Sequence, residues 1–293
     1  MREMNGEGIL AGLDAALEYC HSLELHGPLR STRFREYRER VAALVETRKT
    51  DGLKAERALY SSDHLSYVVA LSEAGEMAIL EPFLRTCAPE VVRPKLAAVL
   101  GGPVLPNEED QNSNHARNIL FELSVAQNLA LAGLNPTLGD APDLTCAIDG
   151  IRFLIECKRP LTRRGARDRI VQARGLLDGL VAMAPATTRG LVALSITKLI
   201  NPGDLILRCA NHATALAIMR SRVRTEGTEL GRNNWAPDAF VGILFHAMTP
   251  TFLEDRRQMV VHQTSYGVGW AAFDVPNGFA VLNFLDRFNK SAY

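Results

Sequence analysis

Apolar residues in the first hundred positions recur at the spacing of an α-helix. Arginine and glutamate fill most of the positions between them, so each segment has one apolar face and one charged face. This pattern predicts a helical N-terminal region, and no catalytic motif stands out in it. The apolar positions concerned are Ile9, Leu13 and Leu17, followed by Tyr37, Val41 and Leu44.

The pattern changes after a break at residues 101–106, Gly-Gly-Pro-Val-Leu-Pro, which is followed by a polar stretch. Glycine and proline interrupt regular structure, so we divide the chain into a helical region, 1–106, and a second domain, 107–293. Alternation of helices and strands in the second domain predicts an α/β fold with a central mixed β-sheet flanked by helices. The expected elements are a helix over 115–132, a hairpin over 143–158, a helix over 166–183, a strand over 190–197, a helix opened by 201–204, strands over 239–246 and 258–264, and an apolar stretch over 279–284.

A tight hairpin is predicted where Asp149-Gly150 separates two apolar runs. A type I′ turn requires positive φ at both central positions, and an Asp-Gly pair accommodates this. With a two-residue turn, Ile148 faces Ile151. The same register places Asp143 opposite Glu156.

Asp143 and Glu156 would form a directly opposed pair of negative charges in this hairpin. Two carboxylates opposed at about 5 Å repel each other by about 3 kcal/mol at an effective dielectric constant of about 20. A bound cation would offset that repulsion, so Asp143 and Glu156 predict a metal site. Side chains of the second hairpin strand alternate between two faces. One face carries Arg152, Leu154, Glu156 and Lys158. The other, which we predict to be the core face, carries Ile151, Phe153, Ile155 and Cys157.

A third carboxylate is predicted to lie on the buried side of the helix that precedes the hairpin. Steps of 100° per residue place Glu122 between Ala126 and Leu129, inside the apolar arc. A buried carboxylate requires a partner, a hydrogen bond or a metal ion. We therefore include Glu122 in the same site.

Charge and composition restrict the classes of function. The 33 Lys and Arg residues balance the 33 Asp and Glu residues, so the chain as a whole is not a simple polyanion binder. Between Lys158 and Arg174, however, seven basic residues accompany a single acid. This local positive surplus directly follows the predicted metal site.

Several other classes lack support in the sequence. The 5 cysteines include no CxxC pair, and the 7 histidines show no metal-ligand spacing. No apolar run approaches the roughly 18 residues of a membrane span, and the N-terminus does not resemble a signal peptide. These observations predict a cytoplasmic protein that binds no membrane.

The residues between positions 112 and 200 resemble the PD-(D/E)XK nuclease superfamily, which has the restriction-endonuclease-like fold. The shared features are an acid on a helix, Pro142-Asp143, twelve intervening residues, Glu156-Cys157-Lys158 at the end of an apolar strand, and a following helix. The resemblance implies a restriction-endonuclease-like core behind the helical N-terminal region. It also implies a nuclease that hydrolyses phosphodiester bonds of nucleic acid, with DNA favoured over RNA.

The resemblance also implies roles for single residues. Asp143 and Glu156 would ligate Mg²⁺, or Mn²⁺ in its place, Glu122 would support the metal site, and Lys158 would orient the attacking water. Gln172 lies where many members carry a glutamine, although position 176 is Leu rather than the accompanying Tyr. Basic residues beside such a site could bind the nucleic-acid backbone. They are Arg159, Arg163, Arg164, Arg167 and Arg169.

Two alternatives stay open at this stage. The chain could be a non-catalytic nucleic-acid-binding protein that keeps the nuclease fold. It could also be a nuclease subunit of a bacterial restriction or antiphage system that is activated by a partner. Many enzymes of this fold act as homodimers, but no sequence feature identifies a dimer face.

Overall fold

The structure is a computed structural model, and it describes residues 3–25, 33–108, 114–232, 240–269 and 278–291. Its N-terminal part is helical, as the sequence predicted, and the predicted apolar positions Ile9, Leu13, Tyr37 and Val41 are buried. A short strand that the sequence did not reveal precedes the first helix. The elements are β1 (Glu3–Asn5), α1 (Gly6–Ser22), α3 (Arg33–Ser62), α4 (His64–Leu84), α5 (Pro89–Leu100) and the 3₁₀ helix η1 (Pro106–Glu108).

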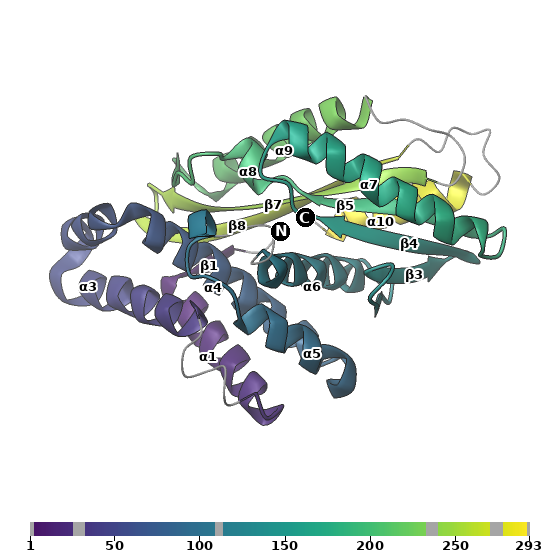
Figure 1. Cartoon of the computed structure of the whole chain (residues 1–293). Helices are drawn as coiled ribbons and strands as arrows, with labels where there is room; N and C mark the ends of the chain where they lie inside the picture. The colour runs from purple at the N-terminus through teal and green to yellow at the C-terminus, as the bar shows by residue number, and fades with distance from the viewer. Residues whose placement is uncertain (1–2, 26–32, 109–113, 233–239, 270–277, 292–293) are drawn as a thin grey trace.

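The rest of the chain alternates helices and strands and forms a mixed sheet, which confirms the predicted α/β class (Figure 1). The 8-stranded sheet has the order β1-β8-β7-β5-β4-β3-β2, and β6 pairs with β7. The strands β4, β5 and β7 run parallel to one another, whereas β3 and β8 are antiparallel to their neighbours β4 and β7. The elements are α6 (His115–Leu131), β2 (Thr137–Leu138), β3 (Leu144–Ile148), β4 (Ile151–Lys158), α7 (Arg163–Ala182), β5 (Thr188–Ser195), α8 (Thr197–Ile200), β6 (Leu207–Cys209), α9 (His212–Arg232), β7 (Phe240–Leu253), β8 (Gln258–Gly269) and α10 (Gly278–Ser291).

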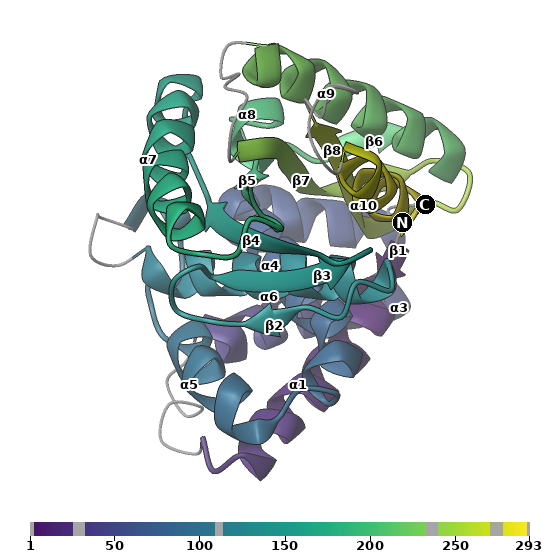
Figure 2. The ribbon, with the colours of Figure 1, turned by 90° about the vertical axis from the view of Figure 1, so that its right-hand side faces the viewer.

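Helices cover both faces of the sheet. On one face, α7 and α9 pack on Leu154, Val192 and Phe245, and on the other, α6 and α10 pack on Phe153 and Ile155. Figure 2 shows α7 and α9 on one side of the strands and α6 with the N-terminal helices on the other.

One core cluster continues from the N-terminal helices into the sheet domain. Leu80 of α4 and Val92 of α5 belong to the same cluster as Leu120 and Leu123 of α6 and Val261 of β8. In addition, β1 pairs with β8, so residues 3–5 complete one edge of the sheet. The N-terminal helices are therefore packed directly against the element that carries Glu122. The boundary that we predicted at position 106 stays a prediction.

The predicted hairpin is confirmed. Asp149 and Gly150 have φ values of 51° and 77°, the positive values that a type I′ turn requires. Ile148 pairs with Ile151, and the register continues to Leu144 opposite Ile155. Asp143 directly precedes β3, so the register of the hairpin places it at the end of β4, where Glu156 and Lys158 lie.

Three details of the sequence prediction are wrong. Only one face of β4 was predicted to be core, but Leu154 on the other face is also buried, because Ala166 and Ile170 of α7 cover it. The helix predicted to open at 201–204 begins at His212, since the short strand β6 intervenes. The strand over 239–246 continues to Leu253 because β8 pairs with its whole second half.

Candidate active site

Three of the predicted catalytic residues lie where β3 begins and β4 ends. They are Asp143, Glu156 and Lys158. The Asp143 carboxylate accepts a hydrogen bond from the backbone N–H of Cys157 at 2.7 Å. Cys157 stands between Glu156 and Lys158 in the chain, so this bond fixes Asp143 beside both. The side chain of Cys157 points into the opposite core, as strand alternation predicted.

Glu156 is buried and only partly paired. Its Oε1 atom forms an ion pair with the ammonium of Lys158, and the two side chains are 8% and 21% exposed respectively. The Oε2 atom of Glu156 makes no hydrogen bond with any described residue. A buried carboxylate oxygen without a partner is unfavourable, which makes this atom a candidate ligand for a cation.

Glu122 is buried on α6, as predicted, and its ion-pair partner belongs to the N-terminal helical region. The Nζ atom of Lys95 on α5 lies 2.9 Å from Glu122 Oε2 and donates a second hydrogen bond to the carbonyl of Gly139, also at 2.9 Å. Both side chains are about one-tenth exposed. The sequence pattern singled out no residue of the N-terminal region for this site, and Lys95 reaches it through tertiary packing.

The three carboxylates influence one another electrostatically. Burial raises the pKa of Asp143 to about 7, with a further contribution from the negative charge of Glu122, while the Cys157 N–H opposes the rise. Burial also raises the pKa of Glu122, although the charge of Lys95 opposes it. Asp143 and Glu122 therefore share one environment, in which burial and neighbouring carboxylates disfavour ionisation.

Two of the three carboxylates, Glu122 and Asp143, line a groove of about 500 Å³ that is open to solvent, whereas Glu156 is buried behind it in β4 and is not part of the lining. Carboxylates and cations both line it, so it could accept a metal ion together with a phosphate group. Residues from α5, α6, α7, the segment before β3 and the end of β4 contribute to its walls. They include Lys95, Glu122, Asp143, Lys158, Arg159 and Arg169.

Two carboxylates of the site have the donor chemistry that suits a divalent cation. Within the described residues, no three His, Cys, Asp or Glu side chains converge closely enough to hold a metal ion, so Asp143, Glu156 and Glu122 do not together form such a cluster. Mg²⁺, however, is commonly bound through one or two carboxylates and keeps several waters. Asp143 and Glu156 supply hard oxygen donors, and one oxygen of Glu156 is buried without a partner. This pair fits Mg²⁺ or Mn²⁺ that retains water ligands.

The predicted arginines lie in different surroundings. Arg163 forms ion pairs with Glu226 and Glu229 of α9, so its charge is neutralised within the fold. Arg164 and Arg167 are exposed on α7, whereas Arg169 lines the groove and donates a hydrogen bond to Gln172 at 2.9 Å. Gln172 itself is exposed on α7. Its contact is therefore with Arg169, and its predicted catalytic role stays a prediction.

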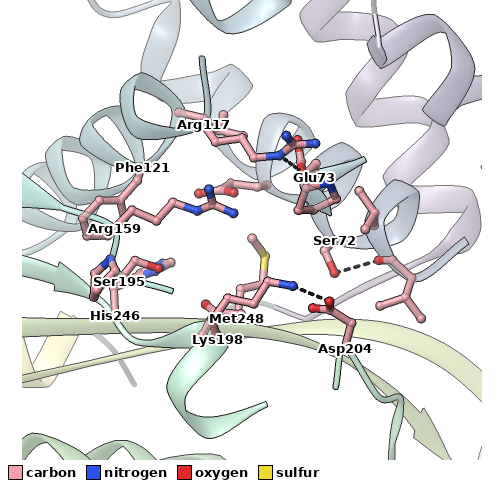
Figure 3. A pocket seen from close by; sticks show the side chains of 17 residues that line it. Ser72, Glu73, Arg117, Phe121, Arg159, Ser195, Lys198, Asp204, His246 and Met248 are labelled. Carbon is pink, nitrogen blue, oxygen red and sulfur yellow. Dashed lines mark hydrogen bonds and ion pairs between the residues drawn. The ribbon is translucent and has the colours of Figure 1, made fainter. Parts of the chain in front are cut away.

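Arg159 also lines a second, more enclosed cavity of about 80 Å³, which the sequence did not predict (Figure 3). This cavity lies between α4, α6, the end of β5 and the middle of β7. Figure 3 shows Arg159 extending among Glu73, Lys198 and His246, with Lys198 paired to Asp204. Two glutamates, Glu73 and Glu76, occur within the apolar helix α4, and that unusual placement is the signal that could have revealed the cavity.

His246 is a neutral member of this cavity. The side-chain amide of Gln263 lies 2.8 Å from His246 Nε2. If that amide donates, the proton of the neutral ring resides on Nδ1, which makes no hydrogen bond with a described residue. Burial lowers the pKa of His246 to about 4. The ring therefore carries no charge at neutral pH.

Glu76 allows a test of the electrostatics around the cavity. Burial raises its pKa from 4.5 to about 7, although a hydrogen bond from Ser124 opposes the rise. Between these pH values the unfolded chain has released the proton and the folded chain holds it, so stability falls as the pH rises. We expect Glu76→Gln to reduce this fall by up to about 1.4 kcal/mol per pH unit in urea denaturation. The exposed Glu90→Gln variant is the control, and equal slopes for all three proteins would contradict the prediction.

Comparisons of the chain with protein-family models, with curated proteins and with solved structures found no match. A search of the described helices for segments long and apolar enough to cross a bilayer also found none.

Proposed function

We propose that the chain is a metal-dependent nuclease that hydrolyses phosphodiester bonds of nucleic acid, with DNA favoured over RNA as substrate. The observation that carries this proposal is the hydrogen bond from the Cys157 N–H to Asp143. It holds one carboxylate beside a second, Glu156, and beside the Lys158 ammonium that is paired with Glu156. Two carboxylates and an ammonium at one strand end form a set suited to phosphoryl chemistry.

The order of elements supports the same proposal. The helix α6 is followed by the antiparallel strands β2, β3 and β4, then by the crossover helix α7 and by β5, which is parallel to β4. This succession is what the resemblance to the PD-(D/E)XK superfamily leads us to expect. We therefore propose a restriction-endonuclease-like core for residues 115–195.

In this proposal each residue has a defined task. Asp143 and Glu156 would hold Mg²⁺ or Mn²⁺, with support from Glu122. When bound, such a cation lowers the pKa of water and offsets charge on the phosphate. Lys158 would orient the attacking water and stabilise the negative charge that develops on the phosphate. Arg159 and Arg169, which line the groove, would contact neighbouring phosphates of the backbone.

Incubation of the purified protein with supercoiled plasmid, linear duplex DNA, single-stranded DNA and RNA tests this function. Each substrate is offered with Mg²⁺, with Mn²⁺ and with EDTA, and Asp143→Asn serves as the matched inactive variant. We expect cleavage that requires the metal and disappears in the variant. Cleavage that persists in EDTA or in Asp143→Asn would contradict the proposal.

The exposed arginines of α7 lead to a separate prediction. Each Lys or Arg contact with a duplex phosphate contributes about 0.9 to the slope of log affinity against log salt concentration. We expect the double variant Arg164→Gln/Arg167→Gln to lower this slope by about 2 in fluorescence anisotropy measurements. Arg174→Gln is the control, because Arg174 lies on the same helix but is paired with Asp178. An unchanged slope in the double variant would remove these residues from the interface.

One observation favours the alternative of a partner-activated protein. Lys95 of the N-terminal region already neutralises Glu122. A site in this state would require a change around α5 before all three carboxylates could act together. A defence-system partner or a second copy of the chain acting on the helical region would produce such a change.

A further inference from the structure

Lys95 joins three parts of the molecule at the candidate site. It projects from α5, whose residues Val92 and Leu96 are fully buried in the N-terminal core. Its ammonium holds Glu122 of α6 and the carbonyl of Gly139, each at 2.9 Å. The N–H of Gly139 in turn donates to the carbonyl of Asp143 at 2.8 Å. The position of Lys95 is thereby linked to both Glu122 and the backbone of Asp143.

The charges around the groove are incompletely balanced. Glu122 is paired with Lys95 and Glu156 with Lys158, whereas the Asp143 carboxylate accepts a hydrogen bond from the Cys157 N–H and has no ion-pair partner among the described residues. Three carboxylates and two ammonium groups leave one negative charge if all are ionised. With a bound divalent cation, the net charge of the group would change from −1 to +1. The cation would also repel the two ammonium groups directly.

Lys95 is better placed to leave than Lys158. Its side chain is long and flexible, it lines the open groove, and Glu122 and Gly139 are its only described partners. Lys158, by contrast, belongs to the same strand as its partner Glu156, two residues away. The groove of about 500 Å³ offers space into which the Lys95 ammonium could turn.

We propose, building on the proposed function, that Lys95 is an internal counter-ion that divalent metal must displace from Glu122. The N-terminal helical region thereby sets the metal concentration at which the site becomes loaded. Lys95 is in this view a positioning residue, because it acts through Glu122. Once displaced, its ammonium would face the groove, where a substrate phosphate would lie.

Direct metal binding tests this inference without an activity assay. Mn²⁺ is titrated calorimetrically into the wild type, Lys95→Met and Lys95→Gln, and the metal-induced rise in Tm is recorded for each. We expect both variants to bind Mn²⁺ about tenfold or more tightly than the wild type, and to gain more in Tm, because Glu122 no longer has a competing partner. Lys95→Gln keeps a hydrogen-bond donor for Gly139, so it separates loss of charge from loss of packing.

Two further variants serve as controls for the effect of Lys95 on Mn²⁺ affinity. Arg93→Met changes another cation of α5 that is paired with Glu24 on the surface, and it should bind Mn²⁺ as the wild type does. In a Glu122→Gln background, Lys95→Met should change the affinity less than about twofold, because the two residues act as one pair. Unchanged or weaker binding in both Lys95 variants, or an equal gain in the Glu122→Gln background, would overturn the inference.

The outcomes also separate this inference from the proposed function. If the wild type binds Mn²⁺ in a manner that depends on Asp143, but Lys95 variants bind it equally well, only the role of Lys95 is overturned. If neither the wild type nor the Lys95 variants bind Mn²⁺ at millimolar concentration, both the inference and the proposed metal-dependent function are overturned.

Discussion

Replacement of Lys158 by methionine is expected to lower the rate of nucleic-acid cleavage by about 10²- to 10⁴-fold. The ammonium of Lys158 is held by Glu156 at the end of β4 and lines the groove beside Asp143. Methionine keeps most of the side-chain volume but removes the charge that would orient water and stabilise the phosphate. Single-turnover cleavage at saturating Mg²⁺ measures the effect on chemistry alone.

Metal binding distinguishes this role of Lys158 from a general disturbance of the site. Lys158→Met should bind Mn²⁺ at least as tightly as the wild type, because an ammonium that competes for Glu156 is gone. Lys290→Met provides the control, since Lys290 is an exposed lysine that is also paired with a carboxylate, that of Asp286. A Lys158→Met rate within about twofold of the wild type would remove Lys158 from the chemistry.

Arg117→Met is expected to lower the free energy of unfolding by about 3–5 kcal/mol. The Arg117 side chain is 2% exposed and forms an ion pair with Glu73. It also donates hydrogen bonds to the Tyr37 hydroxyl at 3.1 Å and to the carbonyls of Pro103 and Val104 at 3.2 and 2.8 Å. Its loss leaves these buried acceptors with fewer donors, and it removes one of the cationic partners that offset the burial of the Glu73 carboxylate.

The direction of the Glu73 pKa shift indicates that these cations stabilise the carboxylate. Burial alone would raise this pKa, but the charges of Arg33 and Arg117, with a smaller contribution from Arg159, outweigh burial and lower it. Urea denaturation measures the loss as a lower midpoint at an unchanged m-value. Arg35→Met is the control, because Arg35 and its partner Glu39 are both 60% exposed, and such pairs contribute about 0.2–1 kcal/mol. A change of less than about 1 kcal/mol for Arg117→Met would show that this network does not hold α4 and α6 together.

Local sequence signals predicted the part of the site that lies within one hairpin. The Asp149-Gly150 turn fixes the register of β3 and β4 by backbone conformation alone, so the proximity of Asp143 and Glu156 followed from the chain itself. The burial of Glu122 followed from helical periodicity in the same way. These features depend on residues that are close in the sequence, where turn geometry and side-chain period are decisive.

Features that depend on distant segments could not be predicted in this way. Lys95 is 27 positions before Glu122, and nothing in its own helix distinguishes it from a solvated lysine. The strand β1 has three residues, too few for a periodic signal, and it forms only because β8 offers an edge. The acids within α4 are an exception, since Glu73 in an apolar helix already indicates a buried partner such as Arg117.

Single-turnover cleavage of duplex DNA by the wild type and by Asp143→Asn at saturating Mg²⁺ tests the proposed nuclease activity and the role of Asp143 together. Asparagine keeps the shape of the side chain and can still accept the Cys157 N–H, but it removes the charge that would hold the cation. We expect cleavage by the wild type and a loss of at least about 10³-fold in the variant, because a bound cation stabilises transition-state charge by several kcal/mol. Equal rates for the two proteins would show that Asp143 does not hold a catalytic metal ion.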